Sequence, residues 1–146
     1  MSRHKQEFTK NYRPLLKKKA KNSFLNNYGK FGLRALNSGY INYSQIEIIK
    51  SLCLKFVKDY NNNSNILGKR YIVWLHVYPS IFITSKGSEA RIGGGKGSPK
   101  LRVARVSAGQ VLIEFSLDSD AGAKKLLNLI SVRLPIKVCL IRSFDF

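Results

Sequence analysis

The stretch Arg91-Ile92-Gly93-Gly94-Gly95-Lys96-Gly97-Ser98 lies between two segments with strand-like sequences. It holds four glycines, two cations and no acid, a composition that does not build a packed core. Because glycine lacks a Cβ atom, the run can adopt positive φ and approach another molecule closely. Ordering it costs conformational entropy, so we expect it to become rigid only against a partner, and its charges indicate an anionic one. A mobile hairpin tip without a binding role is the alternative.

The overall charge points to a polyanion as the partner. The chain has 146 residues, enough for one domain with a substantial core, and carries 26 Lys+Arg against 8 Asp+Glu, a net charge of +18. Its apolar runs are too short to span a membrane. The cations are spread over termini, strands and loops rather than gathered on one amphipathic helix. We therefore predict a folded nucleic-acid-binding protein, with an anionic membrane surface as the second candidate.

The sequence contains no recognisable metal or redox motif. Cys53 and Cys139 lie far apart, and each falls in an apolar pattern, so we expect both to be reduced core residues. His4 and His76 are isolated from each other and from the cysteines. We predict neither a metal site nor a cofactor.

A nucleotide-hydrolase interpretation of the glycine loop fails on its spacing. Ala90 stands where a phosphate-binding loop requires its first glycine, Gly97 stands in place of the hydroxyl, and a strand pattern follows instead of a helix. Glu114 lies on a predicted strand, where a surface ion pair is its simplest role, and His76 has no assignable nucleophile beside it. We predict that the protein is not an enzyme.

Residue patterns predict an α+β fold, with two helices packed on a mixed or antiparallel sheet. A capping box of Ser44 and Glu47, with Tyr43 and Ile48 as a hydrophobic staple, marks the start of the first helix, which should end near residue 60. Asp118 or Ser119 should cap the second helix, which stops at Leu134-Pro135, and Ala108-Gly109 should turn a hairpin. Strands are expected at Phe31–Leu36, Tyr71–Tyr78 (as a central strand), Ile81–Thr84, Leu101–Val106, Gln110–Ser116 and Ile136–Ile141.

Residues 1–27 form a basic N-terminal extension ahead of a single domain at residues 28–146. The first 21 residues hold eight Lys and Arg against the one acid Glu7. Transit peptides are also basic, but because the sequence begins at Met1 we expect a retained arm, disordered in solution, that contacts nucleic acid.

A second concentration of charge surrounds the glycine loop. Between residues 86 and 105 six cations stand against the single acid Glu89. Neutralised phosphates release counterions, so binding should depend strongly on salt. Structured RNA is favoured over DNA, because no helix-turn-helix, zinc finger or basic zipper is present.

In the glycine loop and the segments around it, the chain resembles the bacterial-type large-subunit ribosomal protein L-sixteen family. The family's loop Arg-Met-Gly-Lys-Gly-Lys-Gly is matched by residues 91–97, and further matches extend over about residues 28–141. They are Phe31-Gly32-Leu33-Arg34-Ala35, Trp74 to Pro79 with Ile83-Thr84, Val103 to Val106, and Leu134-Pro135-Ile136-Lys137. The form of residues 104–110 is most similar to mitochondrial members.

The resemblance implies a structural constituent of the large ribosomal subunit. Such a protein binds large-subunit rRNA and neighbouring ribosomal proteins, and its loop lies near tRNA acceptor arms at the peptidyl-transferase centre. The composition is rich in residues that have AT-rich codons, which indicates an organelle or an AT-rich bacterium. Together with the similarity to mitochondrial members, it predicts an organelle-encoded protein of the mitochondrial ribosome. This chain departs from the family at Gly94 (usually Lys), His76 (usually Arg) and Arg102 (usually Trp), and in an insertion over residues 61–67. A free RNA-binding or RNA-processing factor is the alternative.

Positively charged residues of the arm and loop, together with the loop glycines, are the predicted RNA contacts. They are Lys17, Lys18, Lys19, Arg34, Lys86, Arg91, Gly93, Gly95, Lys96, Gly97, Lys100, Arg102 and Arg105.

Overall fold

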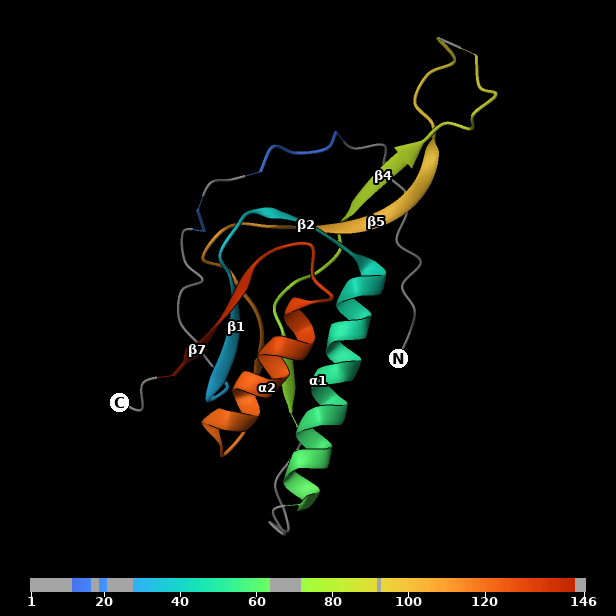
Figure 1. The fold of residues 1–146 in the computed structure, drawn as a ribbon. Coiled ribbons are helices and arrows are strands. Elements are labelled where there is room, and N and C mark those ends of the chain that lie inside the picture. The colour runs from blue at the N-terminus through green and yellow to red at the C-terminus, as the bar shows by residue number, and fades with distance from the viewer. Residues whose placement is uncertain (1–11, 17–18, 21–27, 64–71, 92, 144–146) are drawn as a thin grey trace.

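The computed structural model describes residues 12–16, 19–20, 28–63, 72–91 and 93–143. This part of the chain forms two helices and seven strands, and the strands make two antiparallel sheets (Figure 1). The first sheet has the order β3 (Val73–Leu75), β6 (Val111–Phe115), β1 (Phe31–Ala35) and β7 (Val138–Arg142). The second has the order β2 (Gly39–Asn42), β5 (Ser98–Val106) and β4 (Ile81–Ser85).

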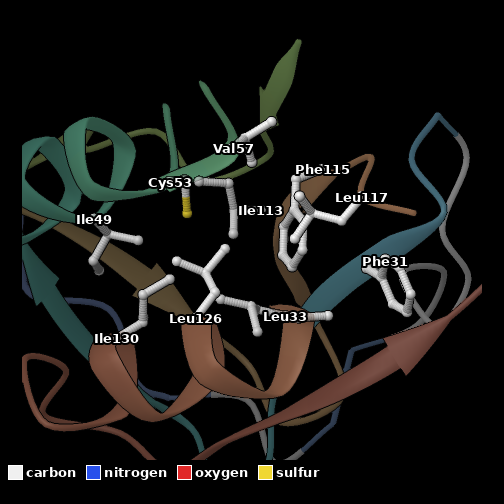
Figure 2. Close-up of a cluster of buried hydrophobic side chains, with 11 residues drawn as sticks. Phe31, Leu33, Ile49, Cys53, Val57, Ile113, Phe115, Leu117, Leu126 and Ile130 are labelled. Carbon is white, nitrogen blue, oxygen red and sulfur yellow. The ribbon is translucent and has the colours of Figure 1, made fainter. Parts of the chain in front are cut away.

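The main core lies between the first sheet and the two helices, α1 (Tyr43–Asn63) and α2 (Asp120–Ser131). Alternate residues of β1 and β6 point at the helices, and side chains from all four elements interlock (Figure 2). Its buried members are Phe31, Leu33, Ile49, Cys53, Val57, Ile113, Phe115, Leu117, Ala123, Leu126 and Ile130. The predicted α+β class is confirmed.

A second apolar cluster joins the two sheets. Ala104 and Val106 of β5 and Ile41 of β2 meet Ile46 at the start of α1 and Leu112 of β6. The inner end of the second sheet is therefore fixed to the domain, whereas the outer residues Ser98 to Leu101 of β5 are exposed.

The predicted hairpin between residues 101–106 and 110–116 is wrong. The turn itself forms: Gly109 has φ 88°, and the Gln110 N–H donates to the Ser107 carbonyl at 3.1 Å. However, β5 pairs with β2 and β4, whereas β6 pairs with β1 and β3. The strands diverge after the turn because each pairs with strands from distant parts of the sequence, and this long-range choice is not encoded in the local alternation of apolar residues.

Two other strand predictions are also corrected. The segment 71–78 was expected to be a central strand, and the structure describes it from Ile72 onward. It contributes only the three residues of β3, which lies at the edge of the first sheet. One further backbone bond follows β3, from the His76 N–H to the Leu112 carbonyl at 3.0 Å, and the chain then leaves the sheet before the buried Pro79. Strand β2 was not predicted, because four residues beginning with glycine are too short for a period-two signal.

The start of α1 lies ahead of the predicted position. The Asn42 N–H donates to Gln45 Oε1 at 2.9 Å, so the reciprocal capping contact lies two residues before the predicted Ser44 box. The Tyr43 hydroxyl donates to Glu47 instead, and Tyr43 is 44% exposed, so no hydrophobic staple forms. The helix also continues to Asn63, past the predicted end.

Both cysteines are free, as predicted. Cys53 is fully buried in the main core, and this burial raises the pKa of its thiol to about 12. The thiol therefore stays protonated and unreactive at neutral pH. Cys139 on β7 is only half-buried, so it is less enclosed than predicted.

The start of α2 agrees with the prediction, and it supplies a first test. Ser119 is the N-cap, and its side chain accepts a hydrogen bond from the Gly122 N–H at 3.4 Å. Replacing Ser119 with alanine should lower the free energy of unfolding by about 1 kcal/mol, because a helix-terminal N–H loses its partner. Urea unfolding measures this, with Ser131→Ala at the other end of α2 as control; equal losses in the two variants would contradict the capping role.

Candidate nucleic-acid interface

The glycine loop is the tip of a projecting hairpin. Strands β4 and β5 pair with each other, from Ile81 opposite Val103 to Ser85 opposite Ser98, and they extend together away from the helices (Figure 1). The described loop residues between them are exposed, except for the half-buried Gly97. The loop therefore contributes little to the core and is presented to whatever lies beyond the domain.

Three glycines give the loop its shape. Gly93 has φ 94° and Gly95 has φ 73°, a region that side-chain-bearing residues rarely adopt, and the Gly95 N–H donates to the Gly93 carbonyl at 2.8 Å. Gly97 is needed for a different reason, because a Cβ atom there would lie 2.4 Å from the Ser85 carbonyl oxygen. Only glycine lets the two backbones close the neck of the loop.

The loop encloses an open hollow of about 330 Å³, and only some of the loop cations line it. Lys86 and Arg91 line the hollow together with Gly94 and Gly97. Lys96 does not line it; its ammonium lies 5.4 Å from the centroid of the Tyr12 ring of the N-terminal arm. The predicted loop residues therefore form two groups with different neighbours.

The cations of β5 are also divided. Lys100 is exposed near the outer end of the hairpin. Arg102 shares a face of the strand with Ala104, and its guanidinium lies 5.4 to 5.8 Å from the ring centroids of three aromatic residues, Tyr43, Tyr78 and Phe82. Its Nε also donates to the Pro79 carbonyl at 2.7 Å. Arg102 is therefore held by contacts within the chain, on the same face of β5 as Ala104 of the second cluster.

Arg105 lies on the other face of β5, where the N-terminal arm crosses. Its Nη1 donates to the Leu15 carbonyl at 3.4 Å, and the Arg13 guanidinium lies 4.3 Å from the centroid of the Tyr40 ring on β2. The Tyr40 hydroxyl donates to the Pro14 carbonyl. The described arm residues thus contact the second sheet, in contrast to the expected disorder.

The remaining predicted contacts lie away from the hairpin or outside the described residues. Lys19 is exposed, next to Ala20, whose N–H donates to the Ala108 carbonyl at 2.8 Å. Arg34 lies on β1 of the first sheet, half-buried, so the structure does not bring it to the loop. Lys17 and Lys18 lie outside the described residues.

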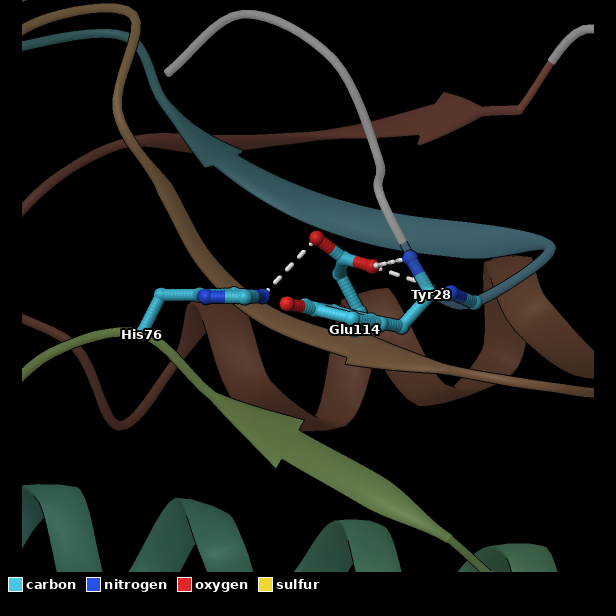
Figure 3. Close-up of polar contacts among 4 residues, drawn as sticks. Tyr28, His76 and Glu114 are labelled. Carbon is cyan, nitrogen blue, oxygen red and sulfur yellow. Dashed lines mark hydrogen bonds and ion pairs between the residues drawn. The ribbon is translucent and has the colours of Figure 1, made fainter. Parts of the chain in front are cut away.

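Sequence reasoning missed a buried polar cluster around Glu114. This residue is 1% exposed, so the predicted surface ion pair is wrong. One carboxylate oxygen accepts the Tyr28 and Gly29 N–H groups at 2.7 and 2.9 Å, and the other lies 2.8 Å from His76 Nε2 (Figure 3). Gly32, opposite Glu114 on β1, has no side chain to compete for that space. The carboxylate therefore joins the first residues of the domain to the segment after β3.

Aromatic rings cover this cluster. The Tyr28 ring is stacked on both Trp74 and His76, with centroids 5.9 and 6.1 Å apart. Within the described residues no three His, Cys, Asp or Glu side chains gather as metal ligands would. No helix in the described part of the chain is long and apolar enough to cross a membrane.

Comparisons with known proteins agree with this geometry. The profile of the family described as "Ribosomal protein L16p/L10e" matches residues 3–141. The "Large ribosomal subunit protein uL16" of Orientia tsutsugamushi (strain Boryong) is 30% identical over 145 residues, which cover 99% of this chain and 99% of that protein. The chain, with its glycine-tipped basic hairpin on an α+β domain, belongs to the ribosomal protein L16p/L10e family.

Proposed function

We propose that the protein is a structural constituent of the large ribosomal subunit that binds rRNA and helps to position tRNA near the peptidyl-transferase centre. Family membership supports the ribosomal role, which is structural rather than enzymatic. The observation that carries the tRNA role is the β4–β5 hairpin, which extends a cationic glycine loop away from the domain. A rigid ribbon with an adaptable tip suits contact with the irregular surface of folded RNA.

The proposed RNA contacts are the loop and the hairpin cations. Lys86, Arg91, Lys96 and Lys100 are exposed, and their charge is opposed in this segment only by Glu89. Arg102 and Arg105 are half-buried and engaged within the chain, so their part in binding is to hold the hairpin and the arm in place. Neighbouring ribosomal proteins complete the set of partners.

A mitochondrial ribosome is the proposed location. The form of residues 104–110 and the richness in Asn, Ile, Lys, Tyr and Phe support it. Sedimentation of a lysate tests both the location and the ribosomal role. We expect the protein to co-migrate with large subunits of the mitochondrial fraction in stoichiometric amounts and to remain there in moderate salt. Substoichiometric recovery or loss in salt would favour a free RNA-binding factor instead.

Arg91 provides the sharpest test of the loop. Replacing Arg91 with alanine should reduce translation by ribosomes that carry the variant, while the free energy of unfolding changes by no more than about 0.5 kcal/mol, since the side chain is exposed and outside both cores. The matched control is Arg133→Ala, an exposed arginine beyond α2. Unfolding of the Arg91 variant, or equal translation defects in the two variants, would contradict the proposed role.

A further inference from the structure

The hollow in the glycine loop has the features of a binding site for one anionic group. It is lined by Ser85, Lys86, Gly87, Ala90, Arg91, Gly94, Gly97 and Ser98, and its volume is about 330 Å³. That volume lies at the small end of the range for ligand pockets and is ample for one group of a larger molecule, such as a phosphate. Its position at the exposed tip of β4 and β5 leaves it accessible to a long chain such as RNA.

The backbone holds the hollow open without help from a packed core. The close approach of Gly97 to Ser85 fixes its neck, and the Ala90 N–H donates to the Gly87 carbonyl at 3.1 Å to form one wall. The positive φ angles of Gly93 and Gly95 turn the chain on either side of the lining residue Gly94. Glycine-rich turns with positive φ angles often form concave surfaces that favour anions.

The lining side chains select the kind of anion. Lys86 and Arg91 are the charged residues of the lining, and the loop's one acid, Glu89, is not part of it. No aromatic ring lines the hollow, so the described lining offers a nucleobase no surface for stacking. A lysine and an arginine on the lining of one hollow suit a phosphate oxyanion.

We propose that this hollow binds a single backbone phosphodiester of RNA, held by Lys86 and Arg91 together. The inference rests on the proposed RNA-binding function and adds to it a defined site. It also assigns Lys96 a separate role, since that ammonium lies over the Tyr12 ring instead. The phosphodiester belongs either to rRNA or to tRNA, which share this chemistry.

A double-mutant cycle on the full-length protein tests whether one phosphate is shared. The dissociation constants for a large-subunit rRNA transcript and for tRNA are measured over a range of salt concentrations, with Lys86→Gln, Arg91→Gln and the double variant. Because both side chains contact the same phosphate, the losses in log K should be non-additive. The salt slope of the double variant should fall by about 0.7 to 0.9, the value for one phosphate. The control pair Lys96→Gln and Lys100→Gln should show additive losses.

A steric variant tests the hollow without changing charge. Gly94 lies on the lining, its φ is not positive, and a Cβ atom there would be 3.9 Å from its nearest neighbour, the Arg91 carbonyl oxygen. Gly94→Leu should therefore add bulk to the lining without straining the loop, and should weaken RNA binding. Ser88→Leu places the same side chain at an exposed loop position outside the lining and should leave binding unchanged.

The outcomes separate this inference from the proposed function. Binding by the wild type, with additive losses for Lys86 and Arg91 and no effect of Gly94→Leu, would overturn the phosphate site alone. Failure of the wild type to bind either RNA would overturn the RNA-binding function itself. A coupled loss seen with only one of the two RNAs supports the site and identifies the source of its phosphodiester.

Discussion

Glu114→Ala should lower the free energy of unfolding by about 2 to 4 kcal/mol, because it removes a buried carboxylate that accepts two backbone N–H groups. The variant leaves the Tyr28 and Gly29 N–H groups without their carboxylate acceptor, and it removes the partner of His76. Each buried polar group that loses its hydrogen bond costs free energy, because water does not replace the lost partner. For a domain whose total stability is typically about 5 to 15 kcal/mol, this is a large fraction.

Urea unfolding of the purified chain, followed by circular dichroism, measures this loss. Glu114→Gln should fall between wild type and alanine, because the amide oxygen still accepts the backbone N–H groups while the charge is lost. Glu89→Ala is the matched control, an exposed acid in the glycine loop, and should change stability by no more than about 0.5 kcal/mol. If Glu114→Ala and Glu89→Ala are equally stable, the carboxylate does not hold the first residues of the domain.

Phe115→Ala should destabilise the domain by a similar amount, about 3 to 5 kcal/mol. Phe115 is fully buried in the main core, and its ring is stacked on Phe31 at a centroid distance of 6.0 Å. Truncation removes apolar surface and leaves a cavity that the helices α1 and α2 and the first sheet cannot fully close.

Thermal and urea unfolding test this second prediction. Phe115→Leu, which refills most of the space, should lose less than the alanine variant. Val132→Ala, at a residue 84% exposed beyond α2, should be close to neutral. A Phe115→Ala variant as stable as Val132→Ala would mean that the core is not centred on the contact between β6 and the helices.

Features with a local physical cause could be predicted from the sequence. The buried stripe of α1, including Ile49, Cys53 and Val57, follows from helical periodicity, and the cap at Ser119 follows from the need of a helix start for an acceptor. The exposure of the loop follows from its composition. These predictions required no knowledge of what lies across the core.

Features that depend on long-range packing could not be predicted. Strands β5 and β6 each alternate and are separated by a tight turn, which is also what a hairpin requires. Only their partner strands, β2 and β4 for β5 and β1 and β3 for β6, assign them to different sheets. Arg102 is one more cation in the sequence, yet in the fold three aromatic rings surround its guanidinium. Residues more than twenty positions away supply two of its partners, the Pro79 carbonyl and the Tyr78 hydroxyl.

The sequence by itself determined the α+β class, the basic character and the glycine loop between strands, because composition and periodicity act locally. Only the tertiary structure decided that Glu114 is a buried acceptor and that Lys86 and Arg91, but not Lys96, line one hollow. The physical reason is the same in both cases. The partners of a side chain are set by how distant backbones approach, and here glycines permit that approach, at Gly29 against Phe115 and at Gly97 against Ser85.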